Sequence, residues 1–246
     1  MNDSTGPSGI DYLVSHLQRG DHYDETLASN PYDAFMTSAE TALLERIVPD
    51  LFEGKIGRYL DFACGTGRIT EVVARHAEHA VGVDISDSML GSAREKNPDI
   101  RFLQADLTRE SHDLGTFDLI TSFRFFGNAE DGLRDEVLGV IARLLCQDGY
   151  LIINGHRNPY ALSNVLHVAT GGKNELTLSW WHLKRLLQRH GLVPIQMHGI
   201  GGWLYRHGLR ERSGDPPAWA GAVERLMRRR PLAPFCPDFL VVAWKP

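Results

Sequence analysis

Three aspartates in the first half of the chain each lie at or just after the end of a short apolar run, namely Asp61, Asp84 and Asp106. An apolar run that ends in a polar residue is typical of a strand in an open α/β sheet, where ligands bind at the carboxyl ends of the strands. A carboxylate can accept hydrogen bonds from two neighbouring hydroxyls, and hydrogen bonds to charged groups contribute about 1.5–3 kcal/mol each. The three acids therefore predict a binding site for a ligand that carries hydroxyl or amino groups.

A glycine-rich turn follows the first of these acids and contains Gly65 and Gly67. Glycine permits positive φ and lets a ligand approach the backbone. A dinucleotide-binding turn would carry a third glycine where Thr70 stands, and a buried Asp61 would repel a pyrophosphate. An acid at this position suits a ligand with an ammonium group instead, so a nicotinamide dehydrogenase is disfavoured.

Histidine and arginine side chains in the second half of the chain are candidates for catalysis and for substrate binding. His156 lies in a polar run, and an unperturbed imidazole titrates near neutral pH, so it is the first candidate for a general base. His182 is the second candidate, within an expected helix. Arg124 and Arg157 would bind an anionic group of a substrate or pair with a structural acid.

These residues are positioned by a regular alternation of expected strands and helices, which predicts an α/β fold with a mainly parallel sheet. A helical region covers residues 10–49 and ends at Pro49. The expected strands are 58–62, 80–84, 100–104, 117–122, 150–154, 193–198 and 239–244, and the expected helices are 68–77, 86–97, 133–146 and 179–190.

The motifs, taken in order, resemble those of class I S-adenosylmethionine-dependent methyltransferases. Residues 61–67 (Asp-Phe-Ala-Cys-Gly-Thr-Gly) are similar to the family's first motif, with Ala63 in place of its first glycine. Residues 81–86, 104–107, 117–120 and 144–150 resemble its later segments, so the resemblance covers about residues 30–155. It is nearest to the group that resembles the ubiquinone and menaquinone methyltransferases.

This resemblance implies a Rossmann-like sheet of seven strands, mostly parallel with the last strand antiparallel, with helices on both faces and lid insertions. Residues 1–246 would form a single domain. Residues 10–50 would be a helical cover, and 155–178 and 199–237 would be insertions on the substrate side. Aromatic residues in these covers suit an organic acceptor or hold the loops together: Tyr23, Tyr32, Tyr160, Trp203, Tyr205 and Trp219.

The resemblance also implies roles for single residues. Asp84 would bind both ribose hydroxyls, Met89 would pack on the adenine, and Asp106 would accept from the adenine amino group. The full set of expected cofactor-binding residues is Tyr23, Asp61, Ala63, Gly65, Thr66, Gly67, Asp84, Ile85, Met89, Asp106, Leu107 and Phe123. Expected substrate-binding residues are Arg124, Arg157, Tyr160 and Trp203.

Composition narrows the function further. The net charge of −5 disfavours nucleic acid as a partner, and no apolar run approaches the roughly 18 residues of a membrane span. Three scattered cysteines form no metal-ligand spacing, and no signal peptide is visible, which favours a cytoplasmic setting without a metal.

The sequence thus predicts a monomeric or homodimeric methyltransferase that uses S-adenosyl-L-methionine. Its expected acceptor is a hydroxyl of a small molecule, such as a sugar or a natural-product metabolite. Three alternatives stay open, namely methylation of nitrogen, methylation of a carboxyl group, and a non-catalytic partner subunit that binds the cofactor.

Overall fold

The computed structural model describes residues 31–156, 158–171, 178–201, 222, 225–227 and 231–246. Tyr23, Arg157 and Trp203, which sequence analysis places in the site, lie outside the described residues. So do most of the expected N-terminal cover and most of the insertion 199–237.

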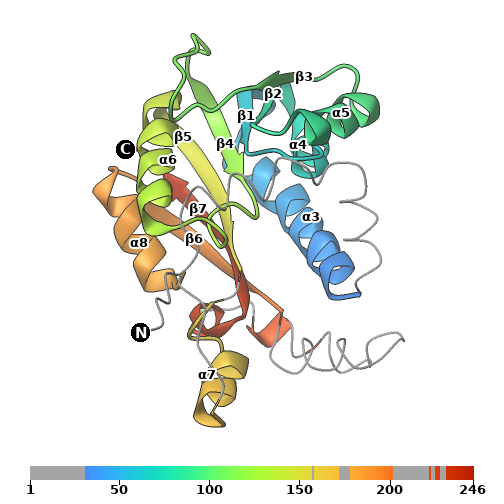
Figure 1. The fold of residues 1–246 in the computed structure, drawn as a ribbon. Helices are drawn as coiled ribbons and strands as arrows, with labels where there is room; N and C mark the ends of the chain where they lie inside the picture. The colour runs from blue at the N-terminus through green and yellow to red at the C-terminus, as the bar shows by residue number, and fades with distance from the viewer. Residues whose placement is uncertain (1–30, 157, 172–177, 202–221, 223–224, 228–230) are drawn as a thin grey trace, which may run out of the picture.

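A single sheet of seven strands organises the described chain (Figure 1). The strands are β1 (Ile56–Phe62), β2 (Ala77–Asp84), β3 (Arg101–Gln104), β4 (Phe117–Ser122), β5 (Leu145–Gly155), β6 (Val193–Ile200) and β7 (Asp238–Trp244). Their order is β3-β2-β1-β4-β5-β7-β6. The first five strands pair in parallel, and β7 runs antiparallel between β5 and β6. The expected fold class, with its antiparallel last strand, is therefore confirmed.

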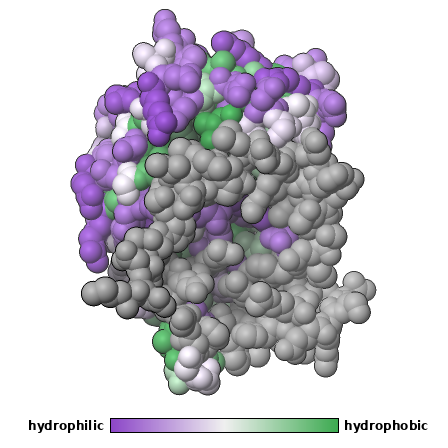
Figure 2. All heavy atoms as spheres, viewed as in Figure 1, coloured by the Kyte–Doolittle hydropathy of each residue, from purple (hydrophilic) through white to green (hydrophobic). Residues whose placement is uncertain are grey.

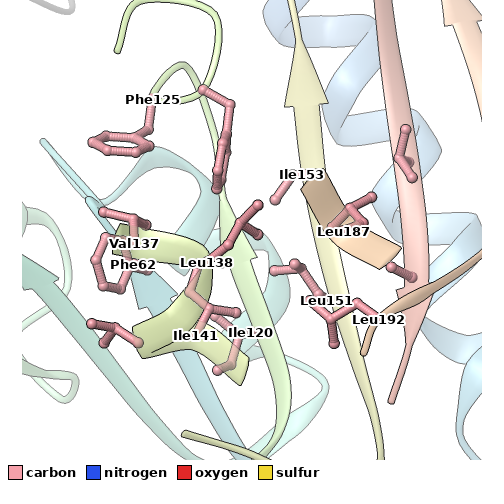
Figure 3. Packing of buried hydrophobic residues seen from close by; sticks show 14 of the residues in the cluster. Phe62, Ile120, Phe125, Val137, Leu138, Ile141, Leu151, Ile153, Leu187 and Leu192 are labelled. Carbon is pink, nitrogen blue, oxygen red and sulfur yellow. The ribbon is translucent and has the colours of Figure 1, made fainter. Parts of the chain in front are cut away.

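Helices pack on both faces of the sheet (Figure 1). The described helices are α3 (Pro31–Leu51), α4 (Arg68–Ala74), α5 (Asp87–Lys96), α6 (Asp131–Leu144), α7 (Leu162–Ala169) and α8 (Trp180–Arg189), with a short 3₁₀ turn η2 (Ala233–Phe235), and α7 lies beyond the lower end of the sheet in the view of Figure 1. One apolar cluster joins α6 and α8 to the sheet (Figure 3), and a second joins α3 and α4 to it. Burial of apolar area in these two layers is the main force that holds the strand ends in place.

Serine side chains begin two of these helices. The Ser86 hydroxyl accepts a hydrogen bond from the backbone N–H of Met89 at the start of α5, and Ser179 does the same for His182 at the start of α8. Such caps satisfy a helix-terminal N–H that otherwise has no partner. At α5 the cap also fixes the position of Met89, close to the glycine-rich turn.

The ends of several elements differ from the sequence-based expectation. β2 begins at Ala77 rather than 80, and α4 ends correspondingly earlier, because Ala77 pairs with Ile56 of β1. Glu78 and His79 in this extension are exposed, so they give no apolar strand pattern. α3 continues two residues past Pro49. α7 is a helix within a stretch that shows no strong helical periodicity.

Hydrophilic residues cover most of the described surface in Figure 2, whereas apolar residues gather over α7 at the lower end of the view. The most exposed among them are Val165, Leu166 and Val168. Within the described residues, no helix combines the length and the apolar character needed to cross a bilayer.

Candidate active site

A cavity lies at the carboxyl ends of the parallel strands β1 to β4, where the loops that follow these strands meet. Its walls include most of the residues that sequence analysis places in the cofactor site. These are Asp61, Ala63, Gly65, Thr66, Asp84, Ile85, Met89, Asp106, Leu107 and Phe123, together with Arg124 from the expected substrate set. The topology alone brings these segments to one edge, because parallel strands end on the same side of a sheet.

The glycine-rich turn carries left-handed backbone at three alternate positions. The φ angles are 57° at Ala63, 55° at Gly65 and 76° at Gly67. Left-handed backbone costs a non-glycine residue roughly 1–2 kcal/mol, so a glycine at position 63 would adopt this conformation with less strain than Ala63 does. The turn is closed by the Gly67 N–H, which donates to the carbonyl of Cys64 over 3.0 Å.

The two glycines have different surroundings. A Cβ on Gly65 would stand 3.4 Å from the Met89 sulfur, on the cavity side. A Cβ on Gly67 would instead meet Ala93, Asn97 and Phe102 at 3.1–3.3 Å, and Gly67 does not line the cavity. Gly67 therefore allows close packing of the turn against α5 and β3, whereas Gly65 keeps the cavity open.

Asp84 holds the glycine-rich turn as well as lining the cavity. One carboxylate oxygen accepts from the backbone N–H of Gly65 at 2.8 Å, and the other accepts from that of Ser86 at 2.9 Å. A carboxylate has about four lone-pair sites, so these two hydrogen bonds do not use all of its acceptor sites. The expected ribose contact and this structural role are compatible.

Asp61 is buried beneath the turn, and two threonine hydroxyls donate to it. Thr70 Oγ1 lies 2.6 Å from one carboxylate oxygen, and Thr121 Oγ1 lies 2.7 Å from the other. Since the Thr121 hydrogen points to Asp61, the Tyr59 hydroxyl donates to Thr121 over 2.6 Å. Burial raises the pKa of Asp61 to about 6, against the lowering effect of these hydrogen bonds and of the nearby Arg68 charge.

Asp106 is held by the turn that follows β3. Its Oδ1 accepts from the backbone N–H and the hydroxyl of Thr108, at 3.0 and 2.6 Å. Its Oδ2 lies 3.5 Å from Nε of Arg109, which is largely exposed. The second oxygen therefore carries only a weak interaction and stays near the cavity wall.

Arg124 follows β4 and belongs to a polar network that sequence analysis does not predict. Its backbone is left-handed, with φ 59°, and its N–H donates to Asn154 Oδ1 at 2.6 Å. Asn154 Nδ2 in turn donates to Glu40 Oε1 over 2.6 Å, and Arg68 Nη2 pairs with Glu40 Oε2 at 2.9 Å. The Arg124 side chain pairs with Asp33 at 3.1 Å. α3 is thereby connected to the glycine-rich turn and to the loop after β4.

Several wall residues are absent from the sequence-based set. Arg68 follows the glycine-rich turn, Asn128 lies in the loop after β4, and Leu133 and Val137 come from α6. The helical spacing of Leu133 and Val137 indicates a core face, which hides their place on the cavity wall. No local pattern singles out Glu40 or Asn154, since their importance comes from contacts between distant segments.

His156 and Tyr160 lie outside the cavity lining. The His156 ring packs against Gly127, where an added Cβ would come within 2.6 Å of it. Tyr160 is half exposed and packs edge-on against Trp181, with ring centroids 5.0 Å apart. The structure thus brings Arg124 to the cavity, places His156 behind the loop after β4, and leaves Tyr160 on the outer surface.

Comparison with known proteins agrees with this geometry. Residues 60–149 match the family model described as a methyltransferase domain. The chain is 30% identical over 141 residues to the Bacillus subtilis protein named "Putative methyltransferase YqeM", a match that covers 54% of this chain and 52% of that protein. It is 29% identical over 197 residues to the Geobacillus protein "Putative methyltransferase GWCH70_2453", covering 75% of this chain and 76% of that one. The chain thus spans about half the length of the first of these relatives.

Solved structures share the fold at low sequence identity. The magnesium protoporphyrin IX methyltransferase of Synechocystis PCC 6803, solved with bound S-adenosylmethionine, gives a TM-score of 0.64 at 11% identity and covers 100% of both chains. The N-methyltransferase NodS of Bradyrhizobium japonicum, solved with S-adenosylhomocysteine, gives 0.60 at 16% identity and 95% of both. The chain thus contains a methyltransferase domain over residues 60–149, and its seven-stranded fold is shared with solved methyltransferases that bind S-adenosylmethionine or S-adenosylhomocysteine, which supports S-adenosylmethionine as its cofactor.

Proposed function

We propose that the protein transfers a methyl group from S-adenosylmethionine to a hydroxyl of a small organic acceptor, such as a sugar or a natural-product metabolite. The observation that carries the proposal is the cavity in which Asp61, Asp84 and Asp106 surround an open glycine-rich turn. Bound S-adenosylmethionine supplies a methyl group on a sulfonium, which is open to in-line attack. The residues of the chain bind this donor, align an acceptor with it and exclude water.

The donor atoms of the cavity fit this cofactor. The strand order β3-β2-β1-β4 sets Asp106, Asp84, Asp61 and Arg124 in sequence along one edge. Asp106 and Asp84 would receive the amino group of the adenine and the two ribose hydroxyls, and Asp61 would lie near the ammonium. The space above Gly65, which a Cβ would begin to fill, leaves room for the carbon chain that joins the sulfur to the amino-acid end of the cofactor.

The acceptor would approach from the β4 side, where Phe123 and Arg124 line the cavity. Arg124 would hold an anionic or strongly polar group of the acceptor. A hydroxyl acceptor is supported by an Aeromonas salmonicida relative named ubiquinone biosynthesis O-methyltransferase, 32% identical over 112 residues. That match covers 42% of this chain and 45% of the relative.

His156 is the proposed base for the hydroxyl proton. A positioned base typically contributes about 10²–10⁴-fold to the rate. Since its ring lies against Gly127, next to the cavity residue Asn128, the acceptor would have to reach past the loop after β4. His156→Ala should then slow turnover by about 10²-fold and remove the acidic limb of the pH–rate profile, where a protonated imidazole cannot accept the hydroxyl proton. Retained activity with an unchanged profile would exclude this role.

The proposed function is tested by incubating the protein with isotopically labelled S-adenosylmethionine and a set of hydroxylated metabolites, then identifying products by mass spectrometry. We expect label on a hydroxyl oxygen of a small acceptor. Label on nitrogen or a carboxyl group would assign one of the alternative acceptors. Tight binding of the cofactor with no transfer to any metabolite or cell extract would favour the non-catalytic partner subunit.

A further inference from the structure

The amino-acid end of the cofactor needs an anion and a cation side by side, because its ammonium and its carboxylate share one carbon atom. The strand order places the adenosine acids Asp106 and Asp84 at β3 and β2, so the amino-acid end lies towards β1 and β4. Among the described residues that line the cavity, the cationic side chains are Arg68 and Arg124. Within the described part of the chain, these two arginines are therefore the candidate partners for the carboxylate.

The hydrogen bonding of the two arginines distinguishes them. Arg124 pairs with Asp33 on the first turn of α3, at 3.1 Å. Arg68 pairs with Glu40 through Nη2, whereas its Nη1 is buried and, within the described part of the chain, has no hydrogen-bond partner. A buried donor without a partner costs about 1–3 kcal/mol, and a ligand oxygen would relieve that cost. Arg68 also lies close enough to Asp61 to lower its pKa, so the two form the required pair of opposite charges.

Resting on the proposed cofactor site, we propose that Arg68 binds the carboxylate of the cofactor's methionine part and that Glu40 positions it. Glu40 is completely buried on α3, and both of its carboxylate oxygens are used, one by Arg68 and the other by Asn154. Asn154 is itself fixed between Glu40 and the backbone of Arg124. This buried chain of contacts leaves the Arg68 guanidinium little freedom to turn away from the cavity wall.

The test compares two ligands that differ only in the carboxylate, namely S-adenosylhomocysteine and its decarboxylated analogue S-adenosyl-3-thiopropylamine. Their dissociation constants are measured by calorimetry for the wild type, Arg68→Gln, Arg68→Lys, Glu40→Gln and Arg124→Gln. Arg75→Gln is the matched control, because Arg75 follows the same helix and its side chain is mostly exposed. Thermal unfolding of each variant reports separately on the fold.

We expect the wild type and Arg75→Gln to prefer S-adenosylhomocysteine by at least about tenfold, which corresponds to 1.4 kcal/mol. Arg68→Gln should lose this preference while keeping its affinity for the decarboxylated analogue. Arg68→Lys keeps the charge but not the planar fork, so the preference should shrink without vanishing. Glu40→Gln should shrink it as well, because Arg68 is then no longer held.

Other outcomes overturn the assignment. If the Arg68 variants lose affinity for both ligands equally, Arg68 has a purely structural role. Loss of the preference in Arg124→Gln alone would move the carboxylate to Arg124. A wild type that binds both ligands equally well would contradict the Arg68 contact but leave the cofactor site standing. A wild type that binds neither would refute the cofactor site itself.

Discussion

At the scale of single residues, Ala63 is the clearest departure from the glycine pattern of the turn. Its φ of 57° is left-handed, a conformation that costs alanine roughly 1–2 kcal/mol. Ala63→Gly should therefore raise the free energy of unfolding by up to about 1 kcal/mol, after the larger chain entropy of glycine is subtracted.

Urea unfolding measures this change. Ala42→Gly is the matched control, since Ala42 is exposed in the interior of α3 and the same substitution there should cost about 1 kcal/mol. A loss of stability in Ala63→Gly as large as in Ala42→Gly would show that Ala63 is not strained.

Asp61 makes stability depend on pH. Its pKa lies near 6 in the folded protein, well above the value of 3.8 for an exposed aspartate, because burial disfavours the charged form. The folded state therefore binds more protons than the unfolded state between about pH 4 and 6. The contribution of Asp61 to the free energy of unfolding is therefore largest below that window and decreases as pH rises through it.

Asp61→Asn removes the titrating group, so the variant should lose this part of the pH dependence. The measurement is the free energy of unfolding of both proteins at several pH values from 4 to 7. Wild-type stability that rises relative to the variant over this range would show that the carboxylate is stabilised in its charged form instead.

The acids of the site are predictable from the sequence, whereas the hydrogen bonds that hold them are not. Asp61, Asp84 and Asp106 are recognisable because each lies at the end of a strand, which a local pattern encodes. The hydrogen bonds of Asp84 to Gly65 and Ser86, and the Glu40 network, are not recognisable in this way. They depend on where separate segments meet in space, and no spacing along the chain records that.

At the scale of elements, Gly67 governs how the turn packs against its neighbours. Gly67→Val adds a branched side chain at a φ of 76°, within 3.1–3.3 Å of Ala93, Asn97 and Phe102. Clashes of this kind typically cost about 1–3 kcal/mol, and the backbone strain adds to that. We expect a clear loss of stability, whereas the sequence-based place of Gly67 among the cofactor-binding residues would predict loss of cofactor binding in an intact fold.

Urea unfolding and a titration with S-adenosylhomocysteine separate these two effects. Gly91→Ala in α5 is the control, since no atom would meet the added Cβ and a helical glycine gains by the change. A Gly67→Val variant that is as stable as the wild type but fails to bind the cofactor would show that Gly67 contributes to cofactor binding and not to packing of the turn.

The elements themselves follow closely from sequence where burial is strong. The strands β1, β4 and β7 are buried over most of their length and each contains consecutive apolar residues, so their existence and type are predictable. Their ends are less so, because pairing at the rim involves exposed residues such as Glu78 and His79 of β2. Pro49 also fails as a helix stop, since a final turn of α3 accommodates it.

At the scale of the whole molecule, one sheet edge gathers the cofactor acids, the glycine-rich turn and Arg124, and α3 is anchored to that edge through Glu40 and Asp33. The central claim is that this edge binds the adenosine and amino-acid parts of S-adenosylmethionine. Within that edge, Asp84 is the residue that we propose binds the ribose.

The most direct test is a calorimetric titration of the wild type and Asp84→Ala with S-adenosylhomocysteine, with NAD as the competing ligand class. The wild type should bind S-adenosylhomocysteine and not NAD. Asp84→Ala should weaken that binding at least about tenfold, or 1.4 kcal/mol, while thermal unfolding shows an intact fold. An unchanged dissociation constant in Asp84→Ala, or a wild type that binds NAD in preference, would contradict the account.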